Sequence, residues 1–196
     1  MDKKIAIAWI DLKFSVNSLI LRKEIVILNG LNGSASFGSL NALMGPSGSG
    51  KTILLKCING KNKSGFGEKS KIYLSSHSKI RSCLIGHENE HLIIGLTAKQ
   101  NLIYASKLKN SGKNMNISHE NNVNNLLSEL MTSDIANNKV EDCSGGEQRR
   151  LLIALELTSY IKPNLLCIDE PTSGLDSNAA EVVRTDFNIV YFKCVS

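Results

Sequence analysis

The octapeptide GPSGSGKT at positions 45–52 constrains this chain most, because it matches the phosphate-binding pattern G-x-x-x-x-G-K-[ST] at every fixed position. Residues 40–44 predict a short buried strand before it, and residues 52–59 predict the start of a helix after it. In that setting the glycines let successive backbone N–H groups turn toward phosphate oxygens, and the helix N-terminus adds a partial positive charge. The predicted nucleotide-binding residues are Gly45, Pro46, Ser47, Gly48, Ser49, Gly50, Lys51 and Thr52.

Two residues of this loop have distinct predicted roles. Lys51 would contact the β and γ phosphates of a nucleotide, and the Thr52 hydroxyl would hold Mg²⁺. The alternative is an accidental loop rich in glycine and serine. An accidental loop needs neither a strand before it nor a helix after it, so the flanking pattern favours the nucleotide site.

Length and composition describe an ordinary soluble globular chain. Its 196 residues suit one domain, with 42% hydrophobic and 21% charged residues. A net charge of +5 is compatible with nucleotide phosphates, an anionic membrane surface or nucleic acid, but so mild an excess is more often only a solvated surface, and we expect no nucleic-acid partner. The five cysteines form no C-x-x-C pair, and their odd number would leave one of them without a disulfide partner. This pattern argues against a disulfide framework or a zinc site and favours reduced, cytosolic thiols. We find neither a signal peptide nor an apolar window of about 18 residues.

Short apolar runs divide the rest of the N-terminal half. Residues 5–9, 13–16 and 25–28 predict strands of a small antiparallel layer, and residues 72–74 and 82–85 predict two more strands. Asn29-Gly30, Asn32-Gly33 and Gly38-Ser39 have the composition of turns.

Helical spacing begins after Thr97, a candidate cap. Ala98, Leu102, Ala105 and Leu108 are predicted to share one face of the helix. Residues 110–125 are rich in Asn, Lys and Ser and predict an exposed flexible connection, and 123–131 return to helical spacing.

A second motif lies at Ser144-Gly145-Gly146-Glu147. Ser144 and Glu147 have the spacing of a capping box, and the helix that follows, 147–159, ends before Pro163. A helix that opens on two glycines leaves its N–H groups uncovered, so this is a second candidate phosphate site. A plain helix cap is the alternative.

A third motif follows the apolar run 165–168, which predicts a fully buried parallel strand. Asp169 and Glu170 stand at its end. In enzymes with this phosphate-binding loop, an acidic residue at that position holds Mg²⁺ and a neighbouring carboxylate orients the attacking water. The alternative is the start of a solvated turn; residues 171–176 (PTSGLD) do predict a turn, in which Asp176 would cap a final helix.

In this order, GPSGSGKT, SGGE and IDEPTSGLD resemble the nucleotide-binding domain of ATP-binding cassette (ABC) transporters. ILNGLNG, NALMGPSGSGKT, IALEL and DEPTSGLDS are most similar to the G subfamily, the half-transporters of sterols, lipids and eye pigments. The likeness covers about residues 5–183. It implies an α/β fold, a P-loop NTPase (RecA-like) core with a small antiparallel layer and a helical subdomain near 88–150. It also implies ATP and Mg²⁺ as ligands.

The resemblance assigns roles to matching positions. Phe14 would stack on adenine, with a place in the strand core as the alternative. Asp169 would hold Mg²⁺, Glu170 would be the general base, and Ser144, Gly145, Gly146 and Glu147 would cover ATP bound to an opposite subunit. The implied partners are a second nucleotide-binding domain, arranged head to tail, and the transmembrane domain of a half-transporter. The implied location is the cytoplasmic face of a membrane, where the chain would power lipid or sterol export.

Two positions depart from the family. His87 stands where the family has a glutamine that touches Mg²⁺ and couples to the transmembrane helices, and imidazole is a poor magnesium ligand. The family's switch histidine has no counterpart, because no histidine follows His119 and the wording after Val183 no longer resembles the family. We therefore expect a C-terminally truncated product without a transmembrane domain. A catalytically impaired fragment with a regulatory or vestigial role is the rival hypothesis.

Overall fold

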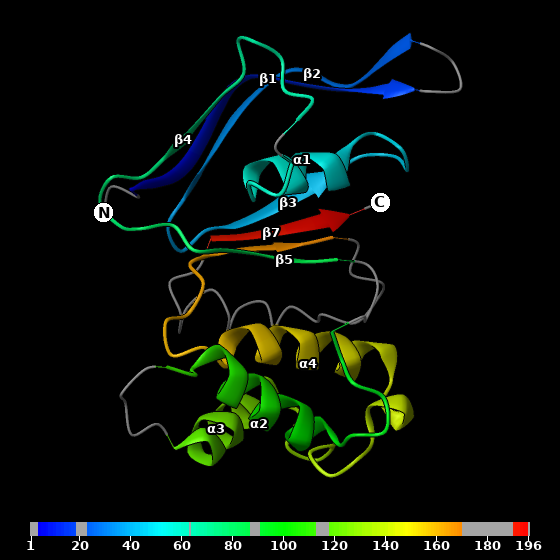
Figure 1. Ribbon diagram of the computed structural model, residues 1–196, viewed down its shortest axis with the longest axis vertical. Helices are drawn as coiled ribbons and strands as arrows, with labels where there is room; N and C mark the ends of the chain where they lie inside the picture. Colours follow the sequence, from blue (N-terminus) through cyan, green and yellow to red (C-terminus); the bar gives the residue numbers. More distant parts are fainter. Residues whose placement is uncertain are drawn as a thin grey trace. The chain divides into compact units, whose positions relative to one another are not determined.

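The computed structural model describes residues 4–18, 23–62, 64–86, 91–112, 118–169 and 190–195 (Figure 1). Two compact units make up the chain. The first contains Met1–Leu84, Asn164–Glu170 and Asn188–Ser196, and the second contains Ile85–Pro163 and Pro171–Phe187. The expectation of a single domain with a helical subdomain near 88–150 stays a prediction.

An antiparallel sheet in the first unit has the strand order β2-β1-β4. Its strands are β1 (Ile5–Ser18), β2 (Lys23–Ser36) and β4 (Lys71–Leu74). β1 pairs antiparallel with both neighbours, with Trp9 opposite Gly33 on β2 and opposite Ile72 on β4. The predicted antiparallel layer is therefore present.

The strands of this layer are longer than the sequence predicts. The runs 5–9 and 13–16 belong to one strand, β1. Its pairing with β2 is irregular near Asp11, which adopts a left-handed conformation (φ 49°). The turns predicted at 29–30 and 32–33 are wrong, since β2 continues through both. Gly33 instead lies against Trp9: a Cβ atom there would stand 2.4 Å from the indole Cζ2. The two Asn-Gly pairs therefore mark irregular pairing and a close approach within a strand.

A second sheet in the same unit has the order β3-β7-β6-β5. The strands β3 (Leu40–Met44), β5 (Ser82–Ile85) and β6 (Leu165–Ile168) have the predicted bounds. The predicted burial of β3 is wrong, because Leu40 and Met44 are exposed. β7 (Val190–Val195), which the sequence reasoning did not predict, pairs in parallel with both β3 and β6. Helix α1 (Lys51–Ile58) follows β3 after the glycine-rich loop, as predicted.

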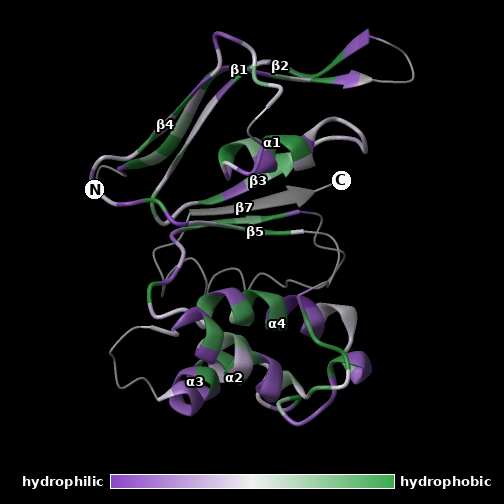
Figure 2. Cartoon of the chain, viewed as in Figure 1, coloured by the Kyte–Doolittle hydropathy of each residue, from purple (hydrophilic) through white to green (hydrophobic). Residues whose placement is uncertain are grey.

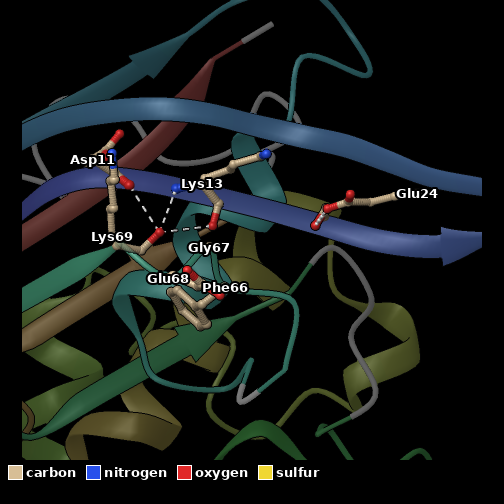
Figure 3. Close-up of a pocket in the computed structure, with 9 residues that line it drawn as sticks. Asp11, Lys13, Glu24, Phe66, Gly67, Glu68 and Lys69 are labelled. Atoms are coloured by element: carbon tan, nitrogen blue, oxygen red, sulfur yellow. Dashed lines mark hydrogen bonds between the residues drawn. The ribbon is translucent and has the colours of Figure 1, made fainter.

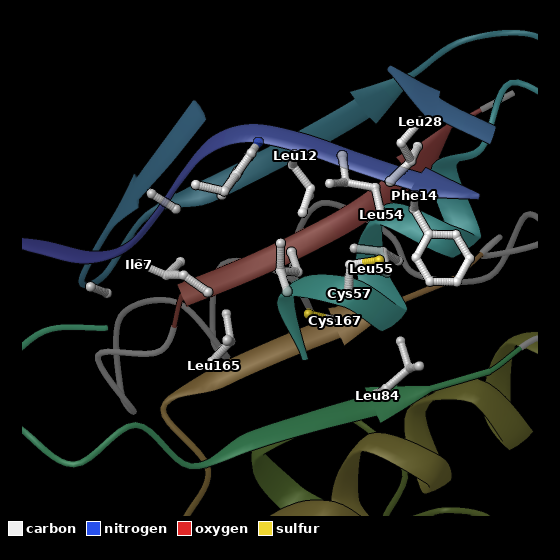
Figure 4. Packing of buried hydrophobic residues seen from close by; sticks show 14 residues of the cluster. Ile7, Leu12, Phe14, Leu28, Leu54, Leu55, Cys57, Leu84, Leu165 and Cys167 are labelled. Carbon is white, nitrogen blue, oxygen red and sulfur yellow. The ribbon is translucent and has the colours of Figure 1, made fainter. Parts of the chain in front are cut away.

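Apolar side chains from α1, β1, β2 and β6 form the core of this unit (Figure 4). Leu55 and Cys57 of α1 are fully buried, as is Cys167 of β6. The core fixes α1 relative to the end of β6, and these two elements carry the first and third motifs. Other labelled members of the cluster are Ile7, Leu12, Phe14, Leu28, Leu54, Leu84 and Leu165.

The second unit is helical in its described residues (Figure 2). It contains α2 (Ala98–Lys109), α3 (His119–Glu129), the 3₁₀ turn η1 (Val140–Asp142) and α4 (Gly145–Leu157). Thr97 caps α2 in a capping box with Gln100, and the N-cap of α3 is Ser118. Across the described parts of the chain, no helix has the length and apolar character needed to cross a membrane.

Two expectations for these helices are wrong. Leu108 is 76% exposed, while Ser106 and Asn110 are buried, so the inner face of α2 ends in polar residues. The Asn110 amide donates to the carbonyls of Ser106 (2.7 Å) and Thr158 (3.0 Å), and its Oδ1 accepts from Tyr160 N (2.7 Å). Residues 118–125 are not an exposed connection, because α3 begins within them.

Candidate nucleotide-binding site

The loop before α1 leaves the helix N-terminus without a side-chain cap in the described structure. Gly50 occupies the N-cap position in a left-handed conformation (φ 92°). A Cβ atom there would lie 2.9 Å from Leu28 Cδ2 and 3.3 Å from Ile27 O, so glycine is required for both its conformation and its size. The amides of the first turn of α1 are therefore left for a ligand, as an anion site at a helix N-terminus requires.

Lys51 bends back over the loop that precedes it. Its Nζ donates to Gly45 O (2.7 Å) and Pro46 O (3.0 Å). These two carbonyls hold the Lys51 ammonium over the loop that leads into α1. The lysine is thus positioned where it would neutralise an anion bound by the loop.

The structure brings Thr52 and Asp169 together across 117 residues of sequence. The Thr52 hydroxyl donates to Asp169 Oδ1 at 2.9 Å. Asp169 directly follows β6 and is 6% exposed. The first and third motifs therefore meet at one point.

The chemistry of this pair suits magnesium. Mg²⁺ prefers hard oxygen ligands and is usually bound by one or two carboxylates together with waters and substrate phosphates. A hydroxyl and a carboxylate in contact supply two such oxygens. No group of three or more His, Cys, Asp or Glu suited to a metal occurs among the described residues.

The second motif forms the predicted capping box at the start of α4. Glu147 Oε2 accepts from Ser144 N (2.7 Å) and Ser144 Oγ (2.8 Å), and Glu147 N donates to Ser144 Oγ (3.4 Å). The hydrogen bonds from Ser144 hold the pKa of Glu147 below its ordinary value. The capping prediction is confirmed. The covering of a nucleotide by Ser144, Gly145, Gly146 and Glu147 stays a prediction.

Phe14 lies in the core of the first unit. Its side chain is 5% exposed and packs edge to face against Phe66, with ring centroids 5.9 Å apart. This placement is the strand-core alternative, and it leaves little ring surface for a ligand. Stacking on adenine stays a prediction. His87, Glu170 and Asp176 lie outside the described residues.

A separate pocket of about 410 Å³ opens beside β1 (Figure 3). Ser70 Oγ helps to hold its wall, donating to Asp11 O (3.0 Å) and accepting from Lys13 N (2.9 Å). The lining mixes two lysines with three carboxylates, and it contains none of the predicted site residues. The lining residues are Asp11, Lys13, Ser15, Glu24, Phe66, Gly67, Glu68, Lys69 and Ser70.

Sequence reasoning missed two side chains that follow the second motif. Gln148 Nε2 donates to Val140 O and Cys143 O, both at 3.0 Å. Arg149 is buried, and its Nη1 donates to Gly86 O at 2.5 Å. No signal in the sequence identified these contacts, since polar residues after a capping box are equally typical of a solvated helix face.

Comparisons with known proteins agree with this geometry. Residues 28–173 match the family described as ABC transporter. ABC transporter G family member 24 of Dictyostelium discoideum is 39% identical over 85% of this chain and 15% of its own length. ABC transporter G family member 22 of Arabidopsis thaliana is 35% identical over 86% of this chain and 23% of its own length. This chain thus spans less than a quarter of either relative.

A solved structure shares the fold. A dimeric ATP-binding cassette in a post-hydrolysis state, bound to ADP and Pi, superposes with a TM-score of 0.72 at 21% identity. The match covers 96% of this chain and 87% of that one. The predicted fold, a P-loop NTPase core with a small antiparallel layer, is confirmed.

Proposed function

Because the chain belongs to the ABC transporter family, we propose that it is the ATP-binding and ATP-hydrolysing cassette of a G-type transporter. It binds ATP with Mg²⁺ at the loop before α1. In a completed transporter, hydrolysis powers the export of lipid-like or sterol-like molecules across a membrane.

The contact between Thr52 and Asp169 carries this proposal. The hydroxyl lies at the start of the helix after the loop and the carboxylate at the end of β6, 117 residues further along the chain. They lie 2.9 Å apart, with the acid nearly buried. This arrangement supports a metal site next to a phosphate site, which is what a nucleoside triphosphate with its magnesium requires.

Each side chain then has a task at the triphosphate. The amides at the start of α1 donate to phosphate oxygens, and Lys51 exchanges its two carbonyl partners for the β and γ phosphates. Thr52 and Asp169 would hold Mg²⁺ through their oxygens. When bound, the ion neutralises charge on the phosphates. Glu170, next to Asp169, would accept the proton of the attacking water.

A second cassette completes the site in this proposal. Ser144–Glu147 would cover ATP held by the partner cassette, in a head-to-tail dimer. Support comes from the start of α4, whose capping box fixes its first turn, and from the structural neighbour, described as dimeric and bound to ADP and Pi. The likeness to G family members supports a transmembrane partner and a position at the cytoplasmic face of a membrane.

Isothermal titration calorimetry of the chain with Mg-ATP tests nucleotide binding. We expect Lys51→Ala to weaken binding at least tenfold, since hydrogen bonds between charged groups contribute about 1.5–3 kcal/mol. Lys56→Ala is the matched control, because Lys56 also lies on α1 and is half-buried. Equal affinities in the wild type and Lys51→Ala would contradict the proposal.

The rival function is a nucleotide-binding fragment without productive hydrolysis. His87, in place of an oxygen-bearing glutamine, favours it, because imidazole is a weak magnesium ligand. Phosphate release from Mg-ATP separates the two functions, measured on the chain alone and mixed with a complete half-transporter. Turnover in the mixture that depends on Glu170 supports the main proposal. Binding without turnover in both samples supports the rival.

A further inference from the structure

We infer that the pocket beside β1 is a binding site for a small zwitterion, a molecule that carries one ammonium group and one carboxylate (Figure 3). The volume of the pocket, about 410 Å³, lies within the range of about 300–1,000 Å³ that is typical of small-molecule sites. All of its lining residues belong to the first unit, and none of them is a predicted nucleotide contact. The inference therefore does not rest on the proposed function.

The floor of the pocket comes from one face of β1. Asp11, Lys13 and Ser15 line the pocket and alternate along the strand with Leu12 and Phe14, which are buried in the core. Successive side chains of a strand point to opposite faces, so the three lining residues share the face that does not pack into the core. They are half-buried, which leaves part of each side chain accessible to a ligand.

Residues 66–70 form a wall that is fixed to β1 by hydrogen bonds. Gly67 N donates to Lys13 O at 2.9 Å. Ser70 Oγ accepts from Lys13 N (2.9 Å) and donates to Asp11 O (3.0 Å). Because these bonds use the backbone of β1, the charged side chains of the pocket are not needed to hold its frame. The pocket is thus already formed in the chain without a ligand.

Charges of both signs line this frame. The charged lining residues are Lys13, Lys69, Asp11, Glu24 and Glu68. Across the residues that the structure describes, no salt bridge joins any two of these side chains. The Glu24 carboxylate instead accepts a hydrogen bond from the Ser15 hydroxyl. Lysines and carboxylates that share a pocket without pairing leave both signs of charge available to a ligand.

This mixture of charges selects against simple ions. Three carboxylates repel an anion and two lysines repel a cation, whereas a zwitterion would meet a group of opposite charge at each end. Phe66 adds apolar surface to the lining, because its half-buried ring meets Phe14 edge to face. A free α-amino acid with an apolar or aromatic side chain combines the same three features.

A ligand-observed NMR titration of the chain without nucleotide tests the site with three probes that share a phenyl ring. L-phenylalanine carries both charges, 2-phenylethylamine carries only the ammonium and 3-phenylpropanoate carries only the carboxylate. We expect L-phenylalanine to bind saturably with a dissociation constant of about 1 mM, an ordinary affinity for a ligand of this size. Each singly charged analogue should bind about three- to tenfold more weakly, since it lacks one charge-assisted contact.

Two exposed lining residues allow one charge at a time to be removed. Lys69→Met should weaken binding of L-phenylalanine about three- to tenfold and leave 2-phenylethylamine unaffected, because only the contact with a carboxylate is lost. Glu68→Gln should weaken L-phenylalanine to a similar extent and leave 3-phenylpropanoate bound at least as well as before. Lys61→Met is the matched control, because Lys61 is exposed between α1 and β4 but does not line the pocket. Thermal unfolding should give wild-type midpoints for all three variants.

Four results would overturn the inference. They are absence of saturation by L-phenylalanine up to about 10 mM, equal affinities for the three probes, binding that K69M and E68Q leave unchanged, and a loss that K61M shares. Failure of the chain to bind ATP would contradict the proposed function alone, because these titrations contain no nucleotide.

Discussion

The hydrogen bond between Thr52 and Asp169 provides the sharpest test of the candidate site. Three variants form a double-mutant cycle: Thr52→Val, which removes the hydroxyl at nearly constant volume, Asp169→Asn, which removes the charge, and the combination of both. Thr52→Ser is the matched control, because it keeps the oxygen that donates to Asp169 Oδ1.

The expected coupling follows from the geometry. A 2.9 Å hydrogen bond to a carboxylate that is 6% exposed is little screened by water. Hydrogen bonds to charged groups contribute about 1.5–3 kcal/mol to stability. We therefore expect a coupling free energy of about 1.5–3 kcal/mol between positions 52 and 169 in the nucleotide-free protein, and nearly wild-type stability for Thr52→Ser.

Urea unfolding followed by the fluorescence of Trp9 is the assay. Trp9 is the single tryptophan of the sequence, and it lies buried in the same unit as Thr52 and Asp169. The reasoning is refuted if the effects of the two single substitutions add within about 0.5 kcal/mol, as they do for independent sites. It is equally refuted if Thr52→Ser is as unstable as Thr52→Val.

Three further predictions concern the surrounding fold. Gly33→Ala should lower the free energy of unfolding by about 1–3 kcal/mol in the same urea assay, because the new Cβ meets the buried Trp9 ring; an unchanged midpoint contradicts the close approach. Asn110→Ala should lower the melting temperature of the second unit, since Tyr160 N loses its acceptor at a cost of about 1–3 kcal/mol and the carbonyls of Ser106 and Thr158 each lose one of two donors, whereas Ser111→Ala on the exposed neighbour should have little effect. Because the pKa of Glu147 is lowered in the folded protein, its contribution to the free energy of unfolding is complete above its unfolded-state pKa of about 4.3. That contribution is lost as pH falls through the lower folded-state pKa. Acidification from pH 6 to pH 3 should therefore destabilise the wild type more than Glu147→Gln, as measured by thermal unfolding, and equal losses would contradict this.

The strands of the second sheet were predictable because their apolar runs are short and bounded. β3, β5 and β6 begin and end where the sequence predicts. β7 was missed because the sequence near residue 190 no longer resembles the family, although its residues Val190–Val195 are mostly apolar. Resemblance to a family predicts only the elements whose sequence still matches that family. For β7, the remaining signal was the run of apolar residues at 190–195.

The antiparallel layer was predicted in kind but not in extent. Asn-Gly is a strong turn signal when two strands need a tight connection. In β2 the same residues serve irregular pairing near Asp11 and contact with Trp9, since glycine suits both a positive φ and a close approach. An Asn-Gly pair in a turn and one inside a strand differ only in the strand they pair with, and that pairing is a long-range contact that the local sequence does not show.

Helix α2 shows a different limit. Hydrophobic periodicity places Leu108 on the inner face, but Ser106 and Asn110 are buried there and Leu108 is exposed. The Asn110 side chain bonds to carbonyls of α2 and of the end of α4 and accepts from Tyr160 N, and an apolar side chain would offer Tyr160 N no acceptor. A buried polar face of a helix has the same sequence pattern as a solvated one. Periodicity therefore placed Leu108, rather than Ser106 and Asn110, on the buried face of α2.

A polar residue on a helix can be buried or solvated, and the sequence pattern does not distinguish the two. This limit explains why some side chains near the candidate site were predicted and others were not. Lys51, Thr52 and Asp169 were predictable because each performs chemistry that few residue types allow, in a fixed order along the chain. Arg149 is buried and donates to a backbone carbonyl, whereas an arginine one turn into a helix normally extends into solvent. Its burial and its bond to Gly86 depend on how β5 ends in the folded unit. Residues that bind a ligand are therefore recoverable from motifs, whereas buried polar side chains that hold backbone groups have to be found in the structure.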